Sequence, residues 1–292
     1  MTATLFKHLR ALVILVPLML AAPGLFAAAP LKVIAWNLEW FPGHRPTASA
    51  EEADQHMKLA REALKVMNPD IFIATEVRDW AAFQELVSVV PGLVTHVVSN
   101  FVDPETGEIR PQQIGIASKL ICRAAAWEPW KANVQNPHRG FSYAALEQKN
   151  GSLLMVYGNH FKSNRGDPAE VAAIRNDQAK QLIAQRSIIE KAFLSQKIGG
   201  WILAGDFNTN HDNQFPDCNV VTDLTAAGFR NTWADTPQVQ RLTWRGDKFG
   251  NFPPTTFDYF FTQGLGDLKA VIVDSPREIS DHHAIKLDLP QD

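Results

Sequence analysis

The chain has 292 residues, of which 46% are hydrophobic and 20% are charged, and its formal net charge is −3. These values are typical of a globular protein with one large domain or two small ones. They lack the basic excess of a protein that coats nucleic acid with high affinity. They remain compatible with a hydrolase that meets phosphates through a metal ion and a few local cations.

The N-terminal segment has the pattern of a secretory signal peptide. Lys7 and Arg10 precede an apolar run at residues 11–26, and three alanines at 27–29 offer a cleavage site for small residues. The alternative is a membrane anchor, but the uncharged core is short for a membrane span. We therefore expect residues 1–29 to be removed and the mature protein to be periplasmic or secreted. It would not insert stably into a membrane, and it would carry two fewer positive charges.

The chain contains two cysteines, Cys122 and Cys218. An exported protein meets an oxidising compartment, so they could form one disulfide. Two buried free thiols are the alternative, because the sequence does not give the Cα separation that a disulfide requires. Two cysteines are too few for a structural zinc site, which takes four ligands.

Apolar runs alternate with helical periodicity along the rest of the chain. A helix is predicted at 53–67, and Asp79 can cap a short helix that runs to residue 86. Asp167 and Pro168 predict the start of a long helix that ends near residue 196, and a short helix is expected at 221–227. A surface hairpin loop is expected at 103–113. Strands are predicted at 31–36, 71–74, 93–98, 114–117, 153–158, 201–204, 257–261 and 284–289.

The interleaving of these strands and helices predicts an α/β protein. Several strands are apolar on both faces, which indicates sheets that are covered on both sides. No change in composition divides the mature chain, so we expect residues 30–292 to form a single domain.

Polar side chains follow five of the predicted strands. Loops at strand ends often carry functional residues on a rigid sheet. Carboxylate and amide oxygens suit Mg²⁺ or Mn²⁺, and Mg²⁺ usually takes only one or two protein carboxylates. The residues are Asn37 and Glu39, Glu76, Asn159 and His160, Asp206 and Asn208, and Asp281 and His282.

The strand at 201–204 shows the alternatives that such a pattern leaves open. It stops at Gly205, and a carboxylate and an amide follow at Asp206 and Asn208. These two residues either carry chemistry or form an Asx turn that caps the strand. The chain has no HExxH, GxSxG or P-loop motif, which argues against a zinc protease, a serine hydrolase and a P-loop nucleotide triphosphatase.

Taken together, these strand ends resemble those of the endonuclease/exonuclease/phosphatase superfamily. That group includes pancreatic deoxyribonuclease, abasic-site endonucleases, neutral sphingomyelinases and inositol polyphosphate 5-phosphatases. The resemblance implies a four-layer α/β sandwich, with two mixed, mostly antiparallel sheets packed face to face and helices outside. It also implies metal-dependent hydrolysis of a phosphate ester. The matching pieces, in the family's order, are Trp36-Asn37, Thr75-Glu76, Gly158-Asn159-His160, Gly205-Asp206-Phe207-Asn208, Phe257-Asp258-Tyr259 and Ser280-Asp281-His282.

The resemblance assigns one group of residues to the metal ion. Glu76 would be the principal ligand, with Asn37 beside it and Asp281 nearby. Glu39 is either a second metal contact, as in some relatives, or a surface acid.

The same resemblance assigns a second group to the reaction. Asp206 would orient and deprotonate the attacking water, and Asn208 would hold a phosphate oxygen. His160 and His282 would bind the phosphate, and Asp258 would orient His282. A carboxylate partner keeps an imidazole protonated, which favours its contact with an anionic phosphate. For His160, a hydrogen-bonded core histidine is the alternative.

Other residues are candidates for contact with the substrate. Lys162 and Arg165 follow His160 and could grip a flanking phosphate, or they could belong to a solvated loop. Asn159 adjoins His160. Trp244 could stack on a base or lie in the core.

A second pair lies on the long predicted helix. Arg175 and Gln178 are one helical turn apart, and we expect both to face the same cleft as the strand ends.

The leading hypothesis is an exported Mg²⁺- or Mn²⁺-dependent phosphodiesterase that acts on nucleic acid as a monomer. One alternative is a sphingomyelinase-like phospholipid phosphodiesterase, which would need an exposed apolar hairpin. The segment at 249–254 is the nearest candidate and is small. A phosphate monoesterase is a third possibility. A catalytically silent binding module would be marked by loss of Glu76, Asp206 or His282, and all three are present. The sequence does not decide the substrate, endo or exo attack, or the metal.

Overall fold

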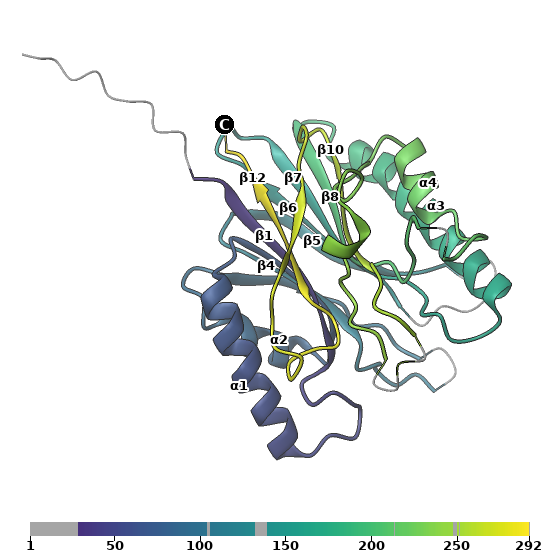
Figure 1. Ribbon diagram of the computed structural model, residues 1–292. Coiled ribbons are helices and arrows are strands. Elements are labelled where there is room, and N and C mark those ends of the chain that lie inside the picture. The colour runs from purple at the N-terminus through teal and green to yellow at the C-terminus, as the bar shows by residue number, and fades with distance from the viewer. Residues whose placement is uncertain are drawn as a thin grey trace, which may run out of the picture.

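The computed structural model describes residues 29–103, 106–131, 139–212, 214–247, 250 and 252–291. Residues 1–28, and with them nearly all of the predicted signal peptide, lie outside this part. The described residues contain two six-stranded sheets that pack face to face (Figure 1). Within this part of the chain, the helices are all too short or too polar to span a bilayer.

The first sheet has the strand order β11-β12-β1-β2-β4-β3. β1 and β2 are parallel, and the other neighbours are antiparallel. The parallel pair is connected by α1, as a crossover between parallel strands requires. The strands are β1 (Leu31–Phe41), β2 (Ile71–Val77), β3 (Val94–Val98), β4 (Gln113–Ser118), β11 (Ala270–Val273) and β12 (Ala284–Leu289).

The second sheet has the order β5-β6-β7-β8-β10-β9 and repeats this plan. β7 and β8 are parallel and are connected by α3, while the other pairs are antiparallel. The strands are β5 (Cys122–Pro129), β6 (Gly140–Glu147), β7 (Leu153–His160), β8 (Ile198–Asp206), β9 (Arg230–Asn231) and β10 (Asp258–Gln263).

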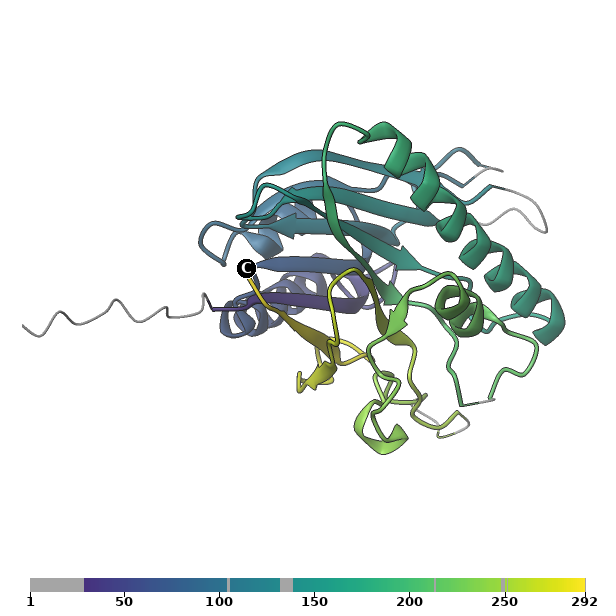
Figure 2. The same ribbon diagram turned by 90° about the horizontal axis from the view of Figure 1, so that it is seen from above.

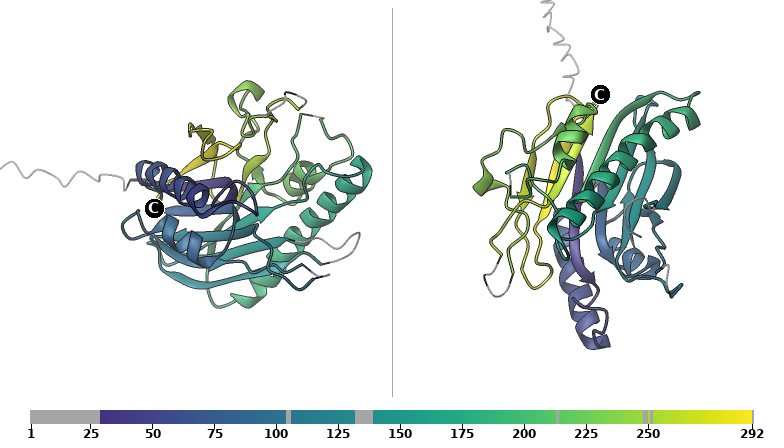
Figure 3. Two further views of the ribbon diagram at one scale, coloured as in Figure 1. Left: turned by 90° about the horizontal axis from the view of Figure 1, so that it is seen from below. Right: turned by 90° about the vertical axis from the view of Figure 1, so that its right-hand side faces the viewer.

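The helices lie outside the two sheets, as Figures 2 and 3 show from other sides. α1 (Ala50–Met67) and α2 (Trp80–Val87) cover the first sheet, and α3 (Pro168–Ala192) and α4 (Val220–Ala226) lie over the second. A short 3₁₀ turn, η1, spans Gln238–Gln240. The predicted four-layer α/β sandwich is therefore confirmed.

Side-chain alternation along β1 explains the layers. Val33 and Ala35 belong to the core between the sheets, whereas Ile34 and Trp36 pack with the helices outside. Asn37 continues the inward-facing series, so the first site residue of the strand points toward the second sheet.

The predicted helix caps are confirmed at two places. The Asp79 carboxylate accepts the Ala82 N–H, and the Asp167 carboxylate accepts the N–H groups of Ala169 and Glu170. A capping box between Ser49 and Glu52 begins α1 and was not predicted.

Some elements differ from the sequence prediction. β5, β6, β9 and β11 were not predicted, and α3 ends at residue 192 rather than near 196. Cys122 and Cys218 are free, half-buried thiols, and burial raises the pKa of Cys122. In the region of the predicted hairpin loop, Val102 and Ile109 form an antiparallel bridge.

Candidate active site

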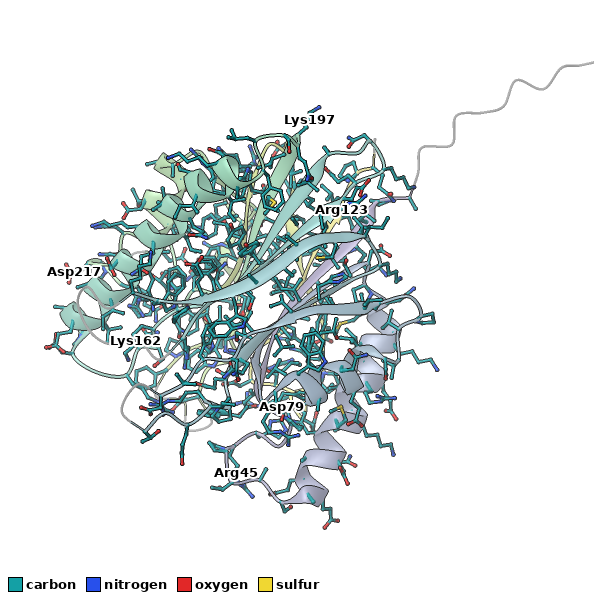
Figure 4. All side chains as sticks on the ribbon, turned by 180° about the vertical axis from the view of Figure 1, so that it is seen from behind. Arg45, Asp79, Arg123, Lys162, Lys197 and Asp217 are labelled. Atoms are coloured by element: carbon teal, nitrogen blue, oxygen red, sulfur yellow. The ribbon has the colours of Figure 1, made fainter. Side chains whose placement is uncertain are left out.

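The site lies at the end of the sandwich where β1, β2, β7 and β8 finish. In Figure 4, Arg45, Asp79 and Lys162, which follow β1, β2 and β7, lie at this end, and Lys197 and Arg123 lie at the other. The β-ladder places Asp206 directly beside His160 on one side and beside Asp258 on the other. Three adjacent strands of one sheet thus bring three site residues into line.

Asp206 is the centre of this arrangement, and it is 2% exposed. Its Oδ2 accepts a hydrogen bond from Asn37 Nδ2 at 3.0 Å, and it lies 3.6 Å from His160 Nε2 and 3.9 Å from His282 Nε2. Its Oδ1 accepts the Asn208 N–H at 2.8 Å. The Asx turn considered as an alternative is therefore present, and it fixes the carboxylate that faces the other side chains.

Glu76 approaches the same point from the first sheet. Its Oε1 lies 3.3 Å from Asn37 Nδ2 and 3.6 Å from His160 Nε2. Its Oε2 accepts the Trp40 N–H at 3.0 Å. Glu76 thus shares two neighbours, Asn37 and His160, with Asp206, although the two carboxylates come from different sheets.

Several backbone positions at the site are strained. Glu39, Trp40, Glu76 and Asn208 all have positive φ, between 49° and 62°. Non-glycine residues rarely adopt this conformation, and it persists where the surroundings hold it, often at functional sites. Gly205 has φ 126°, and a Cβ there would lie 2.1 Å from the Asn159 carbonyl oxygen. Only glycine therefore fits directly before Asp206.

His282 is oriented by Asp258, as the resemblance implied. The distance from His282 Nδ1 to Asp258 Oδ2 is 2.7 Å, and both side chains are buried. Two N–H groups, those of Phe257 and Asp258, donate to Thr243 Oγ1, which fixes the start of β10. The Ser280 hydroxyl accepts the His282 N–H at 2.9 Å. The imidazole is therefore held with Nε2 toward Asp206.

The electrostatic environment gives the three titratable groups different protonation behaviour. Burial, opposed in part by His282, raises the pKa of Asp206 to about 7. Burial and Arg139 hold the pKa of His160 well below its ordinary value. Burial would lower the pKa of His282, but Asp258 and other carboxylates raise it well above its ordinary value. These opposite shifts favour a neutral His160 and a protonated His282.

Oxygen donors suitable for a hard cation lie at the mouth of the site. The side chains of Glu76, Glu39 and Asp281 are 13%, 21% and 32% exposed. The Asp281 N–H donates to Glu39 Oε2 at 3.0 Å, so these two acids lie side by side. Both line a cavity of about 1200 Å³ that also includes His44 and Glu278.

The donor set fits Mg²⁺ or Mn²⁺ better than Zn²⁺, which takes three or four protein ligands. Among the residues that the structure describes, no group of three or more His, Cys, Asp or Glu side chains is arranged to hold a metal ion. Mg²⁺ needs only one or two carboxylates and takes water and phosphate oxygens besides. Asn37 turns its Nδ2 toward Glu76 and Asp206, while its Oδ1 accepts the Glu39 N–H at 3.1 Å. In this orientation the Asn37 side chain positions the carboxylates of Glu76 and Asp206.

Among the predicted substrate contacts, Lys162 and Arg165 lie on the loop that follows β7, and Arg165 is exposed. Lys162 Nζ donates to the carbonyls of Ser163 and Arg165, at 3.2 and 2.6 Å. Asn159 is not brought to the site. It is fully buried, its Nδ2 donates to the Ala204 carbonyl at 3.2 Å, and strand alternation turns it away from His160.

Trp244 lies beside the predicted metal ligands. Its Nε1 donates to Asp281 Oδ2 at 3.0 Å, and its ring packs on Phe257 with the centroids 5.4 Å apart. It is half-buried and orients an acid of the site. Of the candidate apolar hairpin at 249–254, residues 249 and 251 lie outside the described residues, and Phe252 is exposed.

Arg139 is a site residue that the sequence did not reveal. Its guanidinium donates to the Phe161 carbonyl at 3.0 Å and to Gln112 Oε1 at 2.7 Å. Burial lowers its pKa, and the nearby charges of Glu76 and Asp206 act in the opposite direction. It directly precedes β6, a strand that was not predicted, so the pattern of polar residues after predicted strands did not include it.

Comparison with known proteins identifies the fold. No protein-family model matches the sequence, and no curated protein is recognisably similar to it. Solved structures do match. An endonuclease/exonuclease/phosphatase from Beutenbergia cavernae is 15% identical with a TM-score of 0.66, over 90% of this chain and 72% of that one.

Two further structures are similar over nearly their whole length. The catalytic domain of human Nocturnin with bound sulfate is 18% identical with a TM-score of 0.65, over 90% of this chain and 94% of that one. Beta toxin from Staphylococcus aureus is 19% identical with a TM-score of 0.64, over 88% and 99% of the two chains. The chain therefore has the fold of endonuclease/exonuclease/phosphatase proteins, as its motifs predicted.

Proposed function

We propose that the protein is a metal-dependent phosphodiesterase that hydrolyses nucleic-acid phosphodiester bonds by attack of water. The observation that carries this proposal is the convergence of Asn37, His160 and His282 on the Asp206 carboxylate, with Asp258 behind His282. These groups provide a base, an acid and neutral donors within a few ångströms of one another.

Each side chain has a task in this reaction. Asp206 accepts a proton from the attacking water, and a pKa of about 7 suits a base near neutral pH. Protonated His282 donates from Nε2 to a phosphate oxygen and stabilises the negative charge that develops there. His160 is neutral and serves as a hydrogen-bonding partner of the phosphate.

Glu76 would hold the metal ion, with Asp281 or Glu39 at the mouth as a second carboxylate. A bound Mg²⁺ or Mn²⁺ would stabilise negative charge on a phosphate oxygen and help the leaving group. Asn37 links Glu76 and Asp206 by donating to both carboxylates. Trp244 holds Asp281 through its indole N–H.

We favour nucleic acid as the substrate because several cations lie close to the site. Lys162 and Arg165 follow β7, and Arg139 lies close enough to Arg165 for their charges to interact. Such cations position a flanking phosphate without reading sequence. The Nocturnin structure, which has a similar fold, contains a bound sulfate, which is a tetrahedral anion like phosphate.

The proposed function is tested with a substrate panel. Purified mature protein is incubated with plasmid DNA, RNA, sphingomyelin and bis(p-nitrophenyl) phosphate, each with Mg²⁺, with Mn²⁺ and with EDTA. We expect cleavage of DNA or RNA that EDTA abolishes and either metal restores. Cleavage of sphingomyelin alone would replace nucleic acid by a phospholipid, and no cleavage of any substrate would contradict the proposal.

We also propose that the protein is exported and acts as a monomer in the periplasm or outside the cell. The support is the N-terminal pattern of two cations, an apolar run and three alanines. N-terminal sequencing of protein from the periplasm or medium should begin after residue 29. An intact N-terminus in the cytoplasmic fraction would contradict export.

A further inference from the structure

Arg175 is a buried arginine on α3 to which the proposed reaction gives no task. It is 2% exposed. Its Nη1 donates to Asn164 Oδ1 at 2.6 Å and to the Asn208 carbonyl at 2.7 Å, with a longer contact of 3.4 Å to the Lys162 carbonyl. Its Cζ lies 5.1 Å from the centre of the Phe215 ring. The guanidinium is therefore held by hydrogen bonds from Nη1 and by its contact with the Phe215 ring, while Nε has no hydrogen-bond partner among the described residues.

The groups that Arg175 holds belong to two different loops of the site. Asn164 is on the loop that follows β7 and His160, and Asn208 is on the loop that follows β8 and Asp206. Asn164 Nδ2 also donates to the Asn208 carbonyl, and Asn208 Nδ2 donates to the Phe161 carbonyl, each at 3.2 Å. Arg175 therefore lies behind a hydrogen-bonded link between the two loops.

Gln178, one helical turn further along α3, supports the same segment. Its Oε1 accepts the Lys162 N–H at 3.0 Å. Helix α3 thus contacts both the N–H and the carbonyl of Lys162, two residues after His160. From their spacing we expected Arg175 and Gln178 to face the cleft. Instead, both residues contact the loops of the site from the side of α3.

Burying the guanidinium of Arg175 in this way costs free energy. The oxygens that accept hydrogen bonds from the Arg175 guanidinium are neutral, and the Cys218 thiol and the Asp206 carboxylate also interact with it. A buried charge is costly unless it is well hydrogen-bonded. Burial accordingly lowers the pKa of Arg175. Asn208, whose carbonyl it holds, has φ 51°, a conformation that its surroundings must maintain.

We propose that Arg175 is a positioning residue that locks the loops after β7 and β8 to each other, and so fixes His160 and Asn208 relative to Asp206. The proposal rests on the proposed phosphodiesterase function of the site. Arg175 acts through the two loops and does not touch the substrate.

The kinetic test compares three variants with wild type on the best substrate of the panel. Arg175→Met keeps the length and removes the donors, and we expect kcat to fall about 10- to 100-fold with a much smaller change in KM, because a small misplacement of reacting groups is costly. Arg175→Lys should recover only part of kcat, because an ammonium group lacks the planar fork of donors.

Arg186→Met is the matched control on the same helix. Arg186 donates to the Ala227 carbonyl at 3.0 Å and to Gln263 Oε1 at 3.1 Å, away from the site. We expect it to lower Tm while leaving kcat within about twofold of wild type. An equal loss of kcat in Arg175→Met and Arg186→Met would contradict positioning and indicate a general loss of stability.

Amide hydrogen exchange provides a readout that does not depend on activity. Peptides covering residues 160–165 and 206–210 should exchange faster in Arg175→Met than in wild type or in Arg186→Met. If Arg175→Met does not fold, Asn164→Ala removes the bridging side chain from an exposed position and should change the same peptides. Unchanged exchange would overturn the proposal, whereas an inactive wild type with the expected exchange pattern would overturn only the proposed function.

Discussion

The carboxylates around His282 keep its imidazole protonated. Asp258 Oδ2 lies 2.7 Å from Nδ1, and Asp206 and Asp281 each have an oxygen 3.9 Å from Nε2. Burial opposes the protonated form, but the three carboxylates hold the pKa of His282 well above its ordinary value. The imidazole is thereby kept as a cation in a buried site, where it is most effective.

Replacing Asp258 by asparagine tests this account. Asp258→Asn keeps the size of the side chain but removes its charge, so the pKa of His282 should fall. Activity that requires protonated His282 is lost as pH rises through that pKa, so the alkaline limb of the kcat profile should move to lower pH. We expect kcat at neutral pH to fall at least about 10-fold. An alkaline limb at the wild-type pH would contradict the role of Asp258.

At the residue scale, the sequence identified the groups that end strands and missed those that act from other places. His160 and Asp206 directly follow apolar runs, so their position was predictable. Asn159 adjoins His160 in sequence, but alternation along β7 places it on the other face of the sheet. Arg139 was missed and the predicted cleft-facing position of Arg175 was wrong, because both side chains act through tertiary contacts for which the sequence carries no local signal.

At the scale of elements, α1 is joined to the loops of the site by His56. This residue is 2% exposed. Its Nδ1 accepts the Gly43 N–H at 2.9 Å, and its Nε2 lies 2.7 Å from the Ile279 carbonyl. The ring stacks on His44, with the centroids 3.8 Å apart. These contacts require a neutral imidazole with its proton on Nε2, and burial, followed by the charge of His44, lowers the pKa of His56 to about 3.

This pKa predicts how stability changes with pH. Below pH 6.5 the unfolded chain takes up a proton at His56 and the folded chain does not, so the free energy of unfolding falls as pH falls toward 3. The contribution of His56 between pH 6.5 and pH 5 is roughly 1–2 kcal/mol. Urea titrations at both pH values should show a smaller pH dependence for His56→Gln than for wild type. An equal pH dependence in the two proteins would exclude His56 as a source.

Two of the strands that the sequence did not predict, β5 and β6, share a cause. β5 and β6 are rich in alanine and contain glycine, serine and proline, which give a weak strand signal. They form in the sheet because β6 pairs along its whole length with the apolar β7. Pairing within the folded sheet therefore determines that β5 and β6 are strands. In contrast, β1, β2, β7 and β8 are apolar enough to be predicted from their own residues.

At the scale of the molecule, two strand-helix-strand units bring the residues of the site together. Each sheet contains one strand-helix-strand unit, β1-α1-β2 in the first and β7-α3-β8 in the second. Because the sheets pack face to face with these strand ends at one end of the sandwich, Glu76 and Asp206 meet across the interface. The motif order predicted this fold, but the details of the interface depend on contacts that only the structure provides.

The most direct test of the account is the effect of Asp206→Asn on metal-dependent cleavage, measured as kcat on the substrate identified by the panel. Asp70→Asn is the matched control, because Asp70 accepts the Lys32 N–H at the other end of the sandwich. We predict that Asp206→Asn lowers kcat by about 100-fold or more, as loss of a general base does, while Asp70→Asn leaves kcat near the wild-type value. Undiminished cleavage by correctly folded Asp206→Asn would contradict the proposal that this carboxylate activates the attacking water.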